Sequence, residues 1–206
     1  MTSSLWIAAQ PLVLASKSAT RRALLQAARL PVECEAPDVD ERLLDEEARS
    51  SGADGQEVAA LLARAKAVEV SRRRPGCVVL GADQTLACEG RIFDKPVDRG
   101  AAADQLEFLQ GKTHSLHAAA ALARDGVVLA ECGDVARLSV RAFSPGFLET
   151  YLDLAGPAVT TSVGAYQVEG LGVHLFEQIE GSHFTVLGLP LLAVLAALRG
   201  LGLVAE

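Results

Sequence analysis

The sequence predicts an α/β fold, in which short buried strands alternate with amphipathic helices. Apolar runs at 12–14 and 77–80 have the length of buried strands, and residues 56–71 place apolar side chains at helical spacing. Two longer segments with strand character, 115–123 and 127–140, are joined by a short turn. Because helices and strands interleave over all 206 residues without an internal repeat, we expect a single domain.

The first part of the chain is expected to hold a strand, a polar loop, a helix and a second strand. After the apolar run 12–14, Ser18 is a suitable N-cap for a helix that continues through 23–28. Residues 32–36 are predicted as the next strand. Residues 45–55 are polar and contain Gly and Ser, so we expect a connecting loop there.

Later elements are marked by capping residues and by proline. Residues 98–110 are predicted as a helix that ends at Gly111, a common C-cap residue. Ser144 and Pro145 suit the cap and the first position of another helix. The apolar segment 173–179 is predicted as a strand.

Charge, apolar runs and cysteines narrow the class of protein. A net charge of -7 argues against a nucleic-acid polymer as partner, because such a partner requires a broad basic surface. The longest apolar run, 186–198, contains Pro190 and is too short to cross a bilayer, so we expect a packed helix and no membrane partner. The cysteines are scattered without a C-x-x-C pair, which favours reduced thiols and a cytoplasmic protein.

Two adjacent arginines, Arg21 and Arg22, stand where the first helix is expected to begin. The first helical turn carries partial positive charge and unpaired N–H groups, so cations there are unfavourable unless an anion joins them. A phosphate ligand would satisfy both arginines, whereas without one both would turn into solvent. If they oppose the helix dipole, glutamine at either position is expected to leave stability unchanged or slightly higher.

Charged residues also follow or flank the apolar elements. Asp83 comes just after the run 77–80, and ligands of open α/β sheets bind beyond the carboxyl ends of strands. Glu41 lies in an acidic stretch, Lys66 lies on an apolar helix, and Lys95 precedes a proline that favours extended backbone. Each has an ordinary explanation as a turn, loop or surface residue. Together they supply carboxylates and cations suited to a metal–polyphosphate.

Short motifs along the chain resemble those of the Maf family of nucleoside triphosphate pyrophosphatases. They occur in the family's order and at similar spacing over nearly the whole length, which makes the match specific. The matching segments are LASKSATRR (14–22), DVDE (38–41), ARAKA (63–67), GADQ (81–84), DKP (94–96), GKTH (111–114), GAY (164–166), IEG (179–181) and VLGLP (186–190).

The resemblance implies an elongated α/β fold, a mixed sheet flanked by helices, shared with inosine triphosphatases, and a homodimer. It implies hydrolysis between the α- and β-phosphates of a nucleotide, to the monophosphate and pyrophosphate, with a divalent cation such as Mg²⁺ or Mn²⁺. Asp83 matches the family's proton acceptor, and we expect Glu41 and Asp83 to hold the metal. The residues matched to triphosphate binding are Ser16, Arg21, Arg22, Lys66 and Lys95.

Three positions bear on which base is recognised. Gln84 with Glu169 matches the family branch that acts on 7-methyl-GTP, whereas threonine with glutamine would match a UTP and dTTP branch. A carboxylate can accept the two donors on the guanine edge and repels the acceptors of a pyrimidine. Thr20 stands where the branches have tryptophan or arginine, and it matches neither. We therefore expect 7-methyl-GTP, with dTTP and UTP as the alternative.

The chain departs from the family pattern at two places. Ala19 replaces a usual proline, and residues 181–185 read GSHFT where the family usually has GDYSN. A non-catalytic nucleotide-binding regulator of septum formation is an alternative, although Asp83 and Glu41 argue against it. An unrelated sugar-phosphate or dinucleotide enzyme is another, but no G-x-G-x-x-G follows the first strand.

Overall fold

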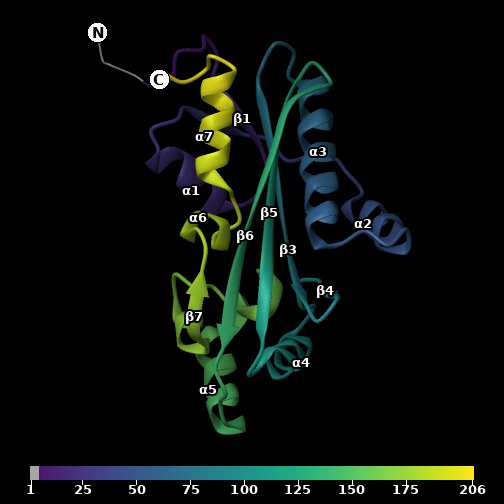
Figure 1. The fold of residues 1–206 in the computed structure, drawn as a ribbon, viewed down its shortest axis with the longest axis vertical. Coiled ribbons are helices and arrows are strands. Elements are labelled where there is room, and N and C mark those ends of the chain that lie inside the picture. The colour runs from purple at the N-terminus through teal and green to yellow at the C-terminus, as the bar shows by residue number, and fades with distance from the viewer. Residues whose placement is uncertain (1–4) are drawn as a thin grey trace. The chain divides into compact units, whose positions relative to one another are not determined.

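The computed structural model describes residues 5–206 (Figure 1). Its contacts divide the chain into two compact units. The first comprises Met1–Gln84, Ala118–Asp134 and Ser182–Glu206, and the second comprises Thr85–His117 and Val135–Gly181. The expectation of a single domain over residues 1–206 stays a prediction.

Strands and helices alternate along the chain, which confirms the expected α/β class. The strands are β1 (Leu12–Ala15), β2 (Val32–Cys34), β3 (Val79–Cys88), β4 (Arg91–Phe93), β5 (Thr113–Arg124), β6 (Val127–Val140) and β7 (Phe176–Glu180). The α-helices are α1 (Ala19–Ala27), α2 (Glu41–Ser50), α3 (Gly55–Arg73), α4 (Arg99–Leu109), α5 (Pro145–Ala155), α6 (His183–Val186) and α7 (Leu191–Gly200). Three 3₁₀ helices are η1 (Gly156–Thr160), η2 (Val163–Ala165) and η3 (Leu171–Leu175).

The strands form one mixed sheet of seven strands in the order β2-β1-β3-β5-β6-β7, with β4 paired to β3. β1 is parallel to both β2 and β3, whereas β4 is antiparallel to β3 and β7 is antiparallel to β6. The expected mixed sheet flanked by helices is therefore confirmed.

Alternate side chains of β1 build two apolar layers in the first unit. Leu12 and Leu14 pack in one buried cluster with Leu25 of α1 and Val194 of α7. Val13, between them, packs on the other face in a cluster that includes α3. Because successive side chains of a strand point to opposite faces, β1 requires a helical cover on both sides. Figure 1 shows α1 and α7 on one side of these strands and α3 on the other.

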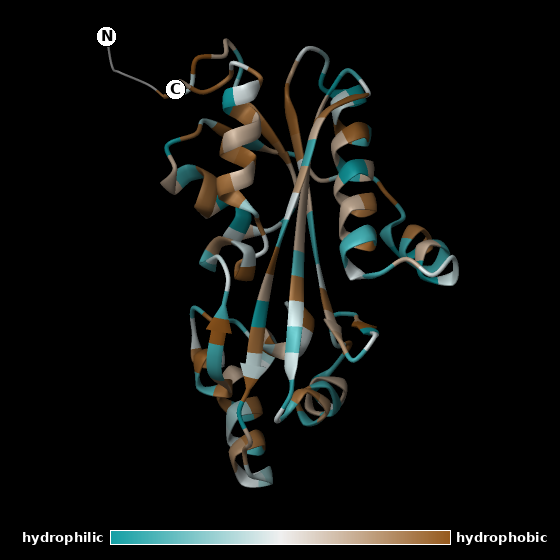
Figure 2. Ribbon diagram, viewed as in Figure 1, coloured by the Kyte–Doolittle hydropathy of each residue, from teal (hydrophilic) through white to brown (hydrophobic). Residues whose placement is uncertain are grey.

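Small residues let α3 lie very close to the sheet. Ala63 packs against Ala119, and Ala67 packs against Ala121. At Gly81 of β3, an added Cβ would lie 2.1 Å from the carbonyl oxygen of Ala63, so only glycine fits there. Hydrophobic and hydrophilic positions alternate along α3 in Figure 2, as expected for a helix with one buried side. This close approach positions the charged residues that α3 and β3 share.

α2 occupies residues that we expected to be a loop. The segment 45–55 is polar, and no residue of α2 is buried, so no buried apolar face marks the helix there. The helix is instead supported by the Asp40 side chain as N-cap and by the ion pair between Asp45 and Arg49, one turn apart. The prediction of a loop over 45–55 was therefore wrong for its first half.

The second unit is built from β4, α4, α5, the 3₁₀ helices and β7, together with parts of the long strands. α4 contacts α5 as well as η1 and η2. The predicted strand 173–179 is correct only in its second half, because η3 continues to Leu175. In η3, a Cβ added at Gly172 would lie 2.5 Å from the Gln167 carbonyl oxygen. The close approach of these two backbone segments therefore requires glycine at position 172.

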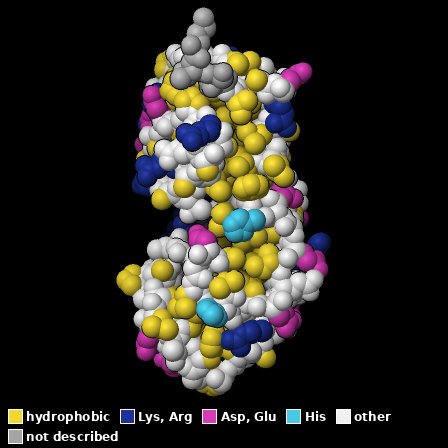
Figure 3. Space-filling view, turned by 90° about the vertical axis from the view of Figure 1, so that its left-hand side faces the viewer, with side chains coloured by type: hydrophobic (Ala, Val, Ile, Leu, Met, Phe, Trp, Pro, Cys, Tyr) yellow, Lys and Arg dark blue, Asp and Glu magenta, His cyan; other side chains and the backbone are white. Residues whose placement is uncertain are grey.

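Apolar side chains also reach the surface. Figure 3 shows one face on which hydrophobic side chains lie among polar ones. The large hydrophobic residues with most exposure include Val97, Leu154 and Leu192. Within residues 5–206 no helix combines the length and the apolar character needed to cross a bilayer.

Candidate active site

Lys66 is the centre of a charged cluster in the first unit. Its Nζ lies 2.6 Å from Asp83 Oδ1 and 2.6 Å from Glu41 Oε2. The Lys66 side chain is 6% exposed and that of Asp83 is 13% exposed, whereas that of Glu41 is 48% exposed. A buried ammonium is stable only when anions replace the water that it has lost. The two carboxylates provide this replacement.

The position of Asp83 in the sheet differs from the expected one. We expected it directly after a strand, but β3 continues through it to Cys88. The neighbouring parallel strand β1 ends at Ala15, which is paired with Gly81. Asp83 therefore lies just beyond the carboxyl end of β1, where α/β sheets bind ligands.

The loop between β1 and α1 follows on this same end of β1. Ser16 is buried, and its Oγ accepts a hydrogen bond from the backbone N–H of Ser18 at 3.2 Å. Ser18 is the N-cap of α1, as predicted, and its Oγ accepts from the backbone N–H of Arg21 at 3.2 Å. The sequence motif thus forms a strand, a short capped loop and a helix N-terminus, an arrangement that suits an anion.

Part of the Arg21 guanidinium is bound to the protein backbone, whereas its Nη2 makes no hydrogen bond within residues 5–206, and the phosphate-binding role expected for Arg21 stays a prediction. Its Nε donates to the carbonyl oxygen of Gly188 at 2.8 Å, and its Nη1 donates to the carbonyl oxygen of Ala82 at 2.9 Å. Burial lowers the pKa of the Arg21 guanidinium, and the charges of Asp83 and Glu41 oppose that shift. Arg21 thus ties α1 to the backbone beside Asp83, and we revise the expectation that its removal leaves stability unchanged.

Arg22 has a different environment from its neighbour. It is exposed, and its side chain has no hydrogen-bond or ion-pair partner in the part of the chain that the structure describes. Thr20, in the first turn of α1, is partly buried. The whole Arg22 guanidinium is therefore free to turn toward a ligand, whereas that of Arg21 is partly committed to the protein.

Gln84, the residue after Asp83, is oriented by the backbone before α7. Its Nε2 donates to the carbonyl oxygens of Thr185 at 2.7 Å and of Val186 at 3.2 Å. Since both partners are acceptors, the amide nitrogen is fixed toward them and Oε1 is left as an acceptor. Thr185 is buried and donates through Oγ1 to Asp134 Oδ2 at 2.5 Å. We had not predicted Asp134 or Thr185 as site residues, because their pairing depends on the fold.

Two of the predicted site residues belong to the second unit. Lys95 is exposed after β4 and precedes the buried Pro96. Glu169 is exposed between η2 and η3. The first unit thus brings together Glu41, Lys66 and Asp83, while the roles expected for Lys95 and Glu169 stay predictions.

The segment that precedes Glu169 is fixed by buried aromatic residues of the second unit. The Nε2 of His114 lies 2.6 Å from the hydroxyl of Tyr166, and the hydroxyl of Tyr151 donates to the carbonyl oxygen of Ala165. Burial lowers the pKa of His114 to about 4, so its ring is neutral at neutral pH. These contacts give the segment a defined backbone conformation.

The carboxylates of the cluster are compatible with a divalent cation bound through a polyphosphate. Residues 5–206 contain no group of three or more His, Cys, Asp or Glu side chains that could hold a metal alone. Mg²⁺, however, commonly takes one or two carboxylates and completes its coordination with substrate phosphates and water. Glu41 and Asp83 suit such a site by their chemistry, because each contacts Lys66 through one carboxylate oxygen and keeps the other for a cation.

The fold and these motifs are those of the Maf family, to which the chain belongs: the family model described as "Maf-like protein" matches residues 11–201. A nucleoside triphosphate pyrophosphatase of Nitrobacter winogradskyi is 51% identical over 197 residues, covering 95% of this chain and 96% of that protein. A 7-methyl-GTP pyrophosphatase of Mesorhizobium japonicum is 49% identical over 193 residues, covering 94% and 97%. A solved HAM1 protein from Coxiella burnetii aligns with 63% of this chain and 72% of its own, at a TM-score of 0.42 and 20% identity.

We predict different effects on stability for the two adjacent arginines. Arg21→Gln should lower the free energy of unfolding by about 2 kcal/mol, because two backbone carbonyls lose a charged donor. Arg22→Gln, its matched control, should change it by less than about 0.5 kcal/mol. Urea denaturation of the two variants and the parent measures both values. Equal values for the two variants would contradict the role given to Arg21.

Proposed function

We propose that the protein hydrolyses nucleoside triphosphates between the α- and β-phosphates, releasing the nucleoside monophosphate and pyrophosphate. The observation that carries the proposal is the buried Lys66 ammonium between Asp83 and Glu41, beside the loop that follows β1. Membership of the Maf family and the names of relatives about half identical to the chain support the same reaction.

The residues of the first unit match the requirements of this hydrolysis. A water molecule attacks phosphorus, the bond to the bridging oxygen breaks, and pyrophosphate leaves with the electron pair. Asp83 contacts Lys66 through Oδ1, which leaves Oδ2 to orient the water and accept its proton. Arg22 and the Lys66 ammonium supply positive charge for the phosphate oxygens. Ser16 and the N-terminus of α1 supply donors for the same oxygens.

A divalent cation, Mg²⁺ or Mn²⁺, is part of the proposal. Glu41 and Asp83 would hold it, since hard cations prefer carboxylate oxygens. When bound, such an ion neutralises phosphate charge. Glu41 is the more accessible of the two carboxylates, and its partner Lys66 can balance the remaining negative charge.

We propose 7-methyl-GTP as the preferred substrate, with UTP and dTTP as the alternative. Gln84 keeps only its Oε1 available, because two backbone carbonyls occupy the amide nitrogen. Glu169 would add a carboxylate acceptor. The guanine edge presents N–H donors that suit acceptors, whereas a pyrimidine edge presents carbonyl oxygens that acceptors repel. Thr20 cannot stack on a base, so we expect a broader substrate range than with tryptophan there.

The proposal extends to the molecules that the protein binds and to its location in the cell. The proposed substrate is a free nucleotide, and the net charge of -7 disfavours a nucleic-acid polymer. We place the protein in the cytoplasm, where nucleoside triphosphates are made. We also propose a homodimer, on the resemblance to the family alone.

We predict that Asp83→Asn lowers turnover by about 100-fold or more, because the amide is nearly isosteric but cannot accept the proton. Pyrophosphate release under saturating nucleotide and Mg²⁺ measures the loss, and equilibrium binding of the nucleotide should persist. Asp125→Asn is a matched control, since Asp125 is an exposed residue of the β5–β6 turn whose sole hydrogen bond within residues 5–206 comes from the Gly76 N–H. An Asp83→Asn protein with the turnover of the parent would remove Asp83 from the mechanism.

A panel of nucleotides tests the substrate. We expect kcat/KM for 7-methyl-GTP to exceed those for GTP, UTP and dTTP, and Glu169→Gln to lower the first by about tenfold, because a neutral acceptor binds donors less strongly. Glu177→Gln, at an exposed position of β7, is the control. If UTP or dTTP is preferred, the role of Glu169 is wrong and only the general reaction stands. If the protein binds nucleotides but releases pyrophosphate from none of them, the alternative of a non-catalytic nucleotide-binding regulator would be favoured.

A further inference from the structure

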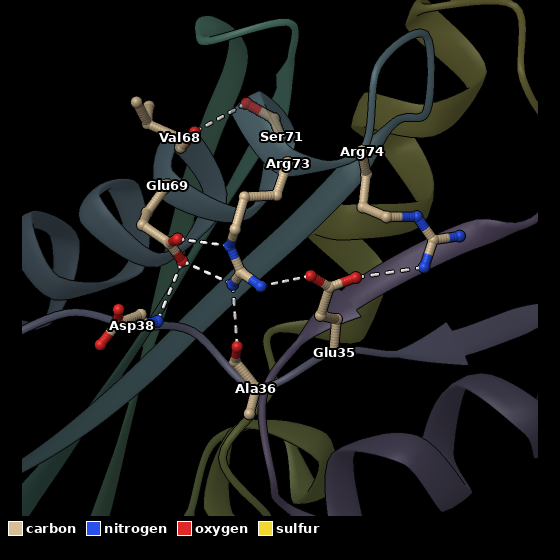
Figure 4. Close-up of polar contacts among 8 residues, drawn as sticks. All are labelled: Glu35, Ala36, Asp38, Val68, Glu69, Ser71, Arg73 and Arg74. Carbon is tan, nitrogen blue, oxygen red and sulfur yellow. Dashed lines mark hydrogen bonds and ion pairs between the residues drawn. The ribbon is translucent and has the colours of Figure 1, made fainter.

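Arg73, at the end of α3, fastens the segment that leads from β2 to α2 (Figure 4). Its Nη2 donates to the carbonyl oxygen of Ala36 at 2.9 Å, and its Nη1 is paired with the carboxylate of Glu35. Arg74 contacts the other oxygen of Glu35 at 3.2 Å. The segment from Glu35 to Asp40 has no helix or strand of its own, so these contacts determine much of its conformation.

Glu69 extends this attachment toward α2. Both of its carboxylate oxygens accept from Arg73, at 2.5 Å and 2.9 Å, and Oε2 also accepts from the backbone N–H of Asp38 at 3.0 Å. The hydrogen bonds from Arg73 lower the pKa of Glu69, so that its carboxylate is charged at neutral pH. A single guanidinium thus holds Ala36 directly and Asp38 through Glu69.

The attached segment ends at the candidate active site. Only Val39 and Asp40 separate Asp38 from Glu41, whose carboxylate contacts Lys66. Lys66, Glu69 and Arg73 are three and four residues apart on α3 and therefore share one side of the helix. Arg73 and Glu69 on that side contact the segment at Ala36 and Asp38, and Lys66 contacts Glu41, the residue that follows the segment.

We propose that Arg73, acting through Glu69 and the backbone of 36–38, is a positioning residue for Glu41. This inference rests on the proposed function, because it assigns Glu41 to the metal and triphosphate. Arg73 itself contacts neither Lys66 nor Asp83.

The contact between Glu41 and Lys66 holds the Glu41 side chain only weakly. The Glu41 side chain is 48% exposed, and an ion pair so open to water fixes a side chain poorly. The Arg73 side chain is also 41% exposed, but its guanidinium reaches two carboxylates and a carbonyl oxygen at once, so several contacts together fix it. A lysine at position 73 would keep the charge but not this fork.

Hydrogen exchange tests the attachment without reference to activity. In Arg73→Gln, exchange of the Asp38 amide should become about tenfold faster, because Glu69 is no longer fixed as its acceptor. Arg64→Gln is the matched control: Arg64 lies on the same helix and makes a similar two-point pair, but with Glu131 of β6. Asp38 exchange in Arg64→Gln should equal that of the parent. Unchanged exchange in Arg73→Gln would overturn the proposal, whatever the enzyme proves to hydrolyse.

Kinetics test the consequence for Glu41. Arg73→Gln and Arg73→Lys should each lower kcat by about tenfold and raise the Mg²⁺ concentration needed for half-maximal rate, with KM changed less than threefold. The Arg64→Gln control should keep the kinetic constants of the parent, and all three variants should keep its melting temperature within a few degrees. Full activity in Arg73→Lys would overturn the proposal, because charge alone would then suffice. If the parent releases no pyrophosphate, the proposed function fails while the exchange result still decides the attachment.

Discussion

The burial of one ammonium group determines the arrangement of the candidate active site. Lys66 lies on a helix that packs closely against the sheet, so its ammonium group is buried and loses most of its hydration. Asp83 from β3 and Glu41 from the start of α2 must therefore lie within contact distance of Nζ. A structural requirement for charge balance thus gathers the residues that a triphosphate and its metal would use.

Packing of small residues makes this cluster possible. Because Gly81 has no side chain, α3 approaches β3 closely enough for Lys66 to reach Asp83, two residues further along the strand. The same helix then continues to Glu69 and Arg73, which hold the segment before Glu41. Arg21 binds the carbonyl oxygen of Ala82 and so connects α1 to the backbone next to Asp83. Asp83 is therefore enclosed by its contacts, whereas Glu41 and Arg22 are open to solvent.

The resemblance to the Maf family was needed to assign Glu41, Lys66 and Asp83 to one site, because each has an ordinary explanation by itself. Residue type and local pattern were enough to predict the α/β class, the extent of α3 and the Ser18 cap. They failed where the decisive contacts are distant in sequence or polar. α2 was missed because ion pairs and a cap, rather than a buried apolar face, support it. The two arginines looked equivalent, yet only Arg21 meets carbonyls from residues 82 and 188, which the fold alone brings near. The network of Glu35, Glu69 and Arg73 was invisible for the same reason.

A double-mutant cycle on Lys66 and Asp83, followed by urea denaturation, tests the central claim most directly. Lys66→Met alone should lower the free energy of unfolding by about 3 kcal/mol, because it leaves a nearly buried carboxylate without its counter-ion. Adding Asp83→Asn to that protein should restore much of the loss, with a coupling energy of about 2 kcal/mol. Effects that add within about 0.5 kcal/mol would show that the two side chains do not depend on each other and would contradict this account.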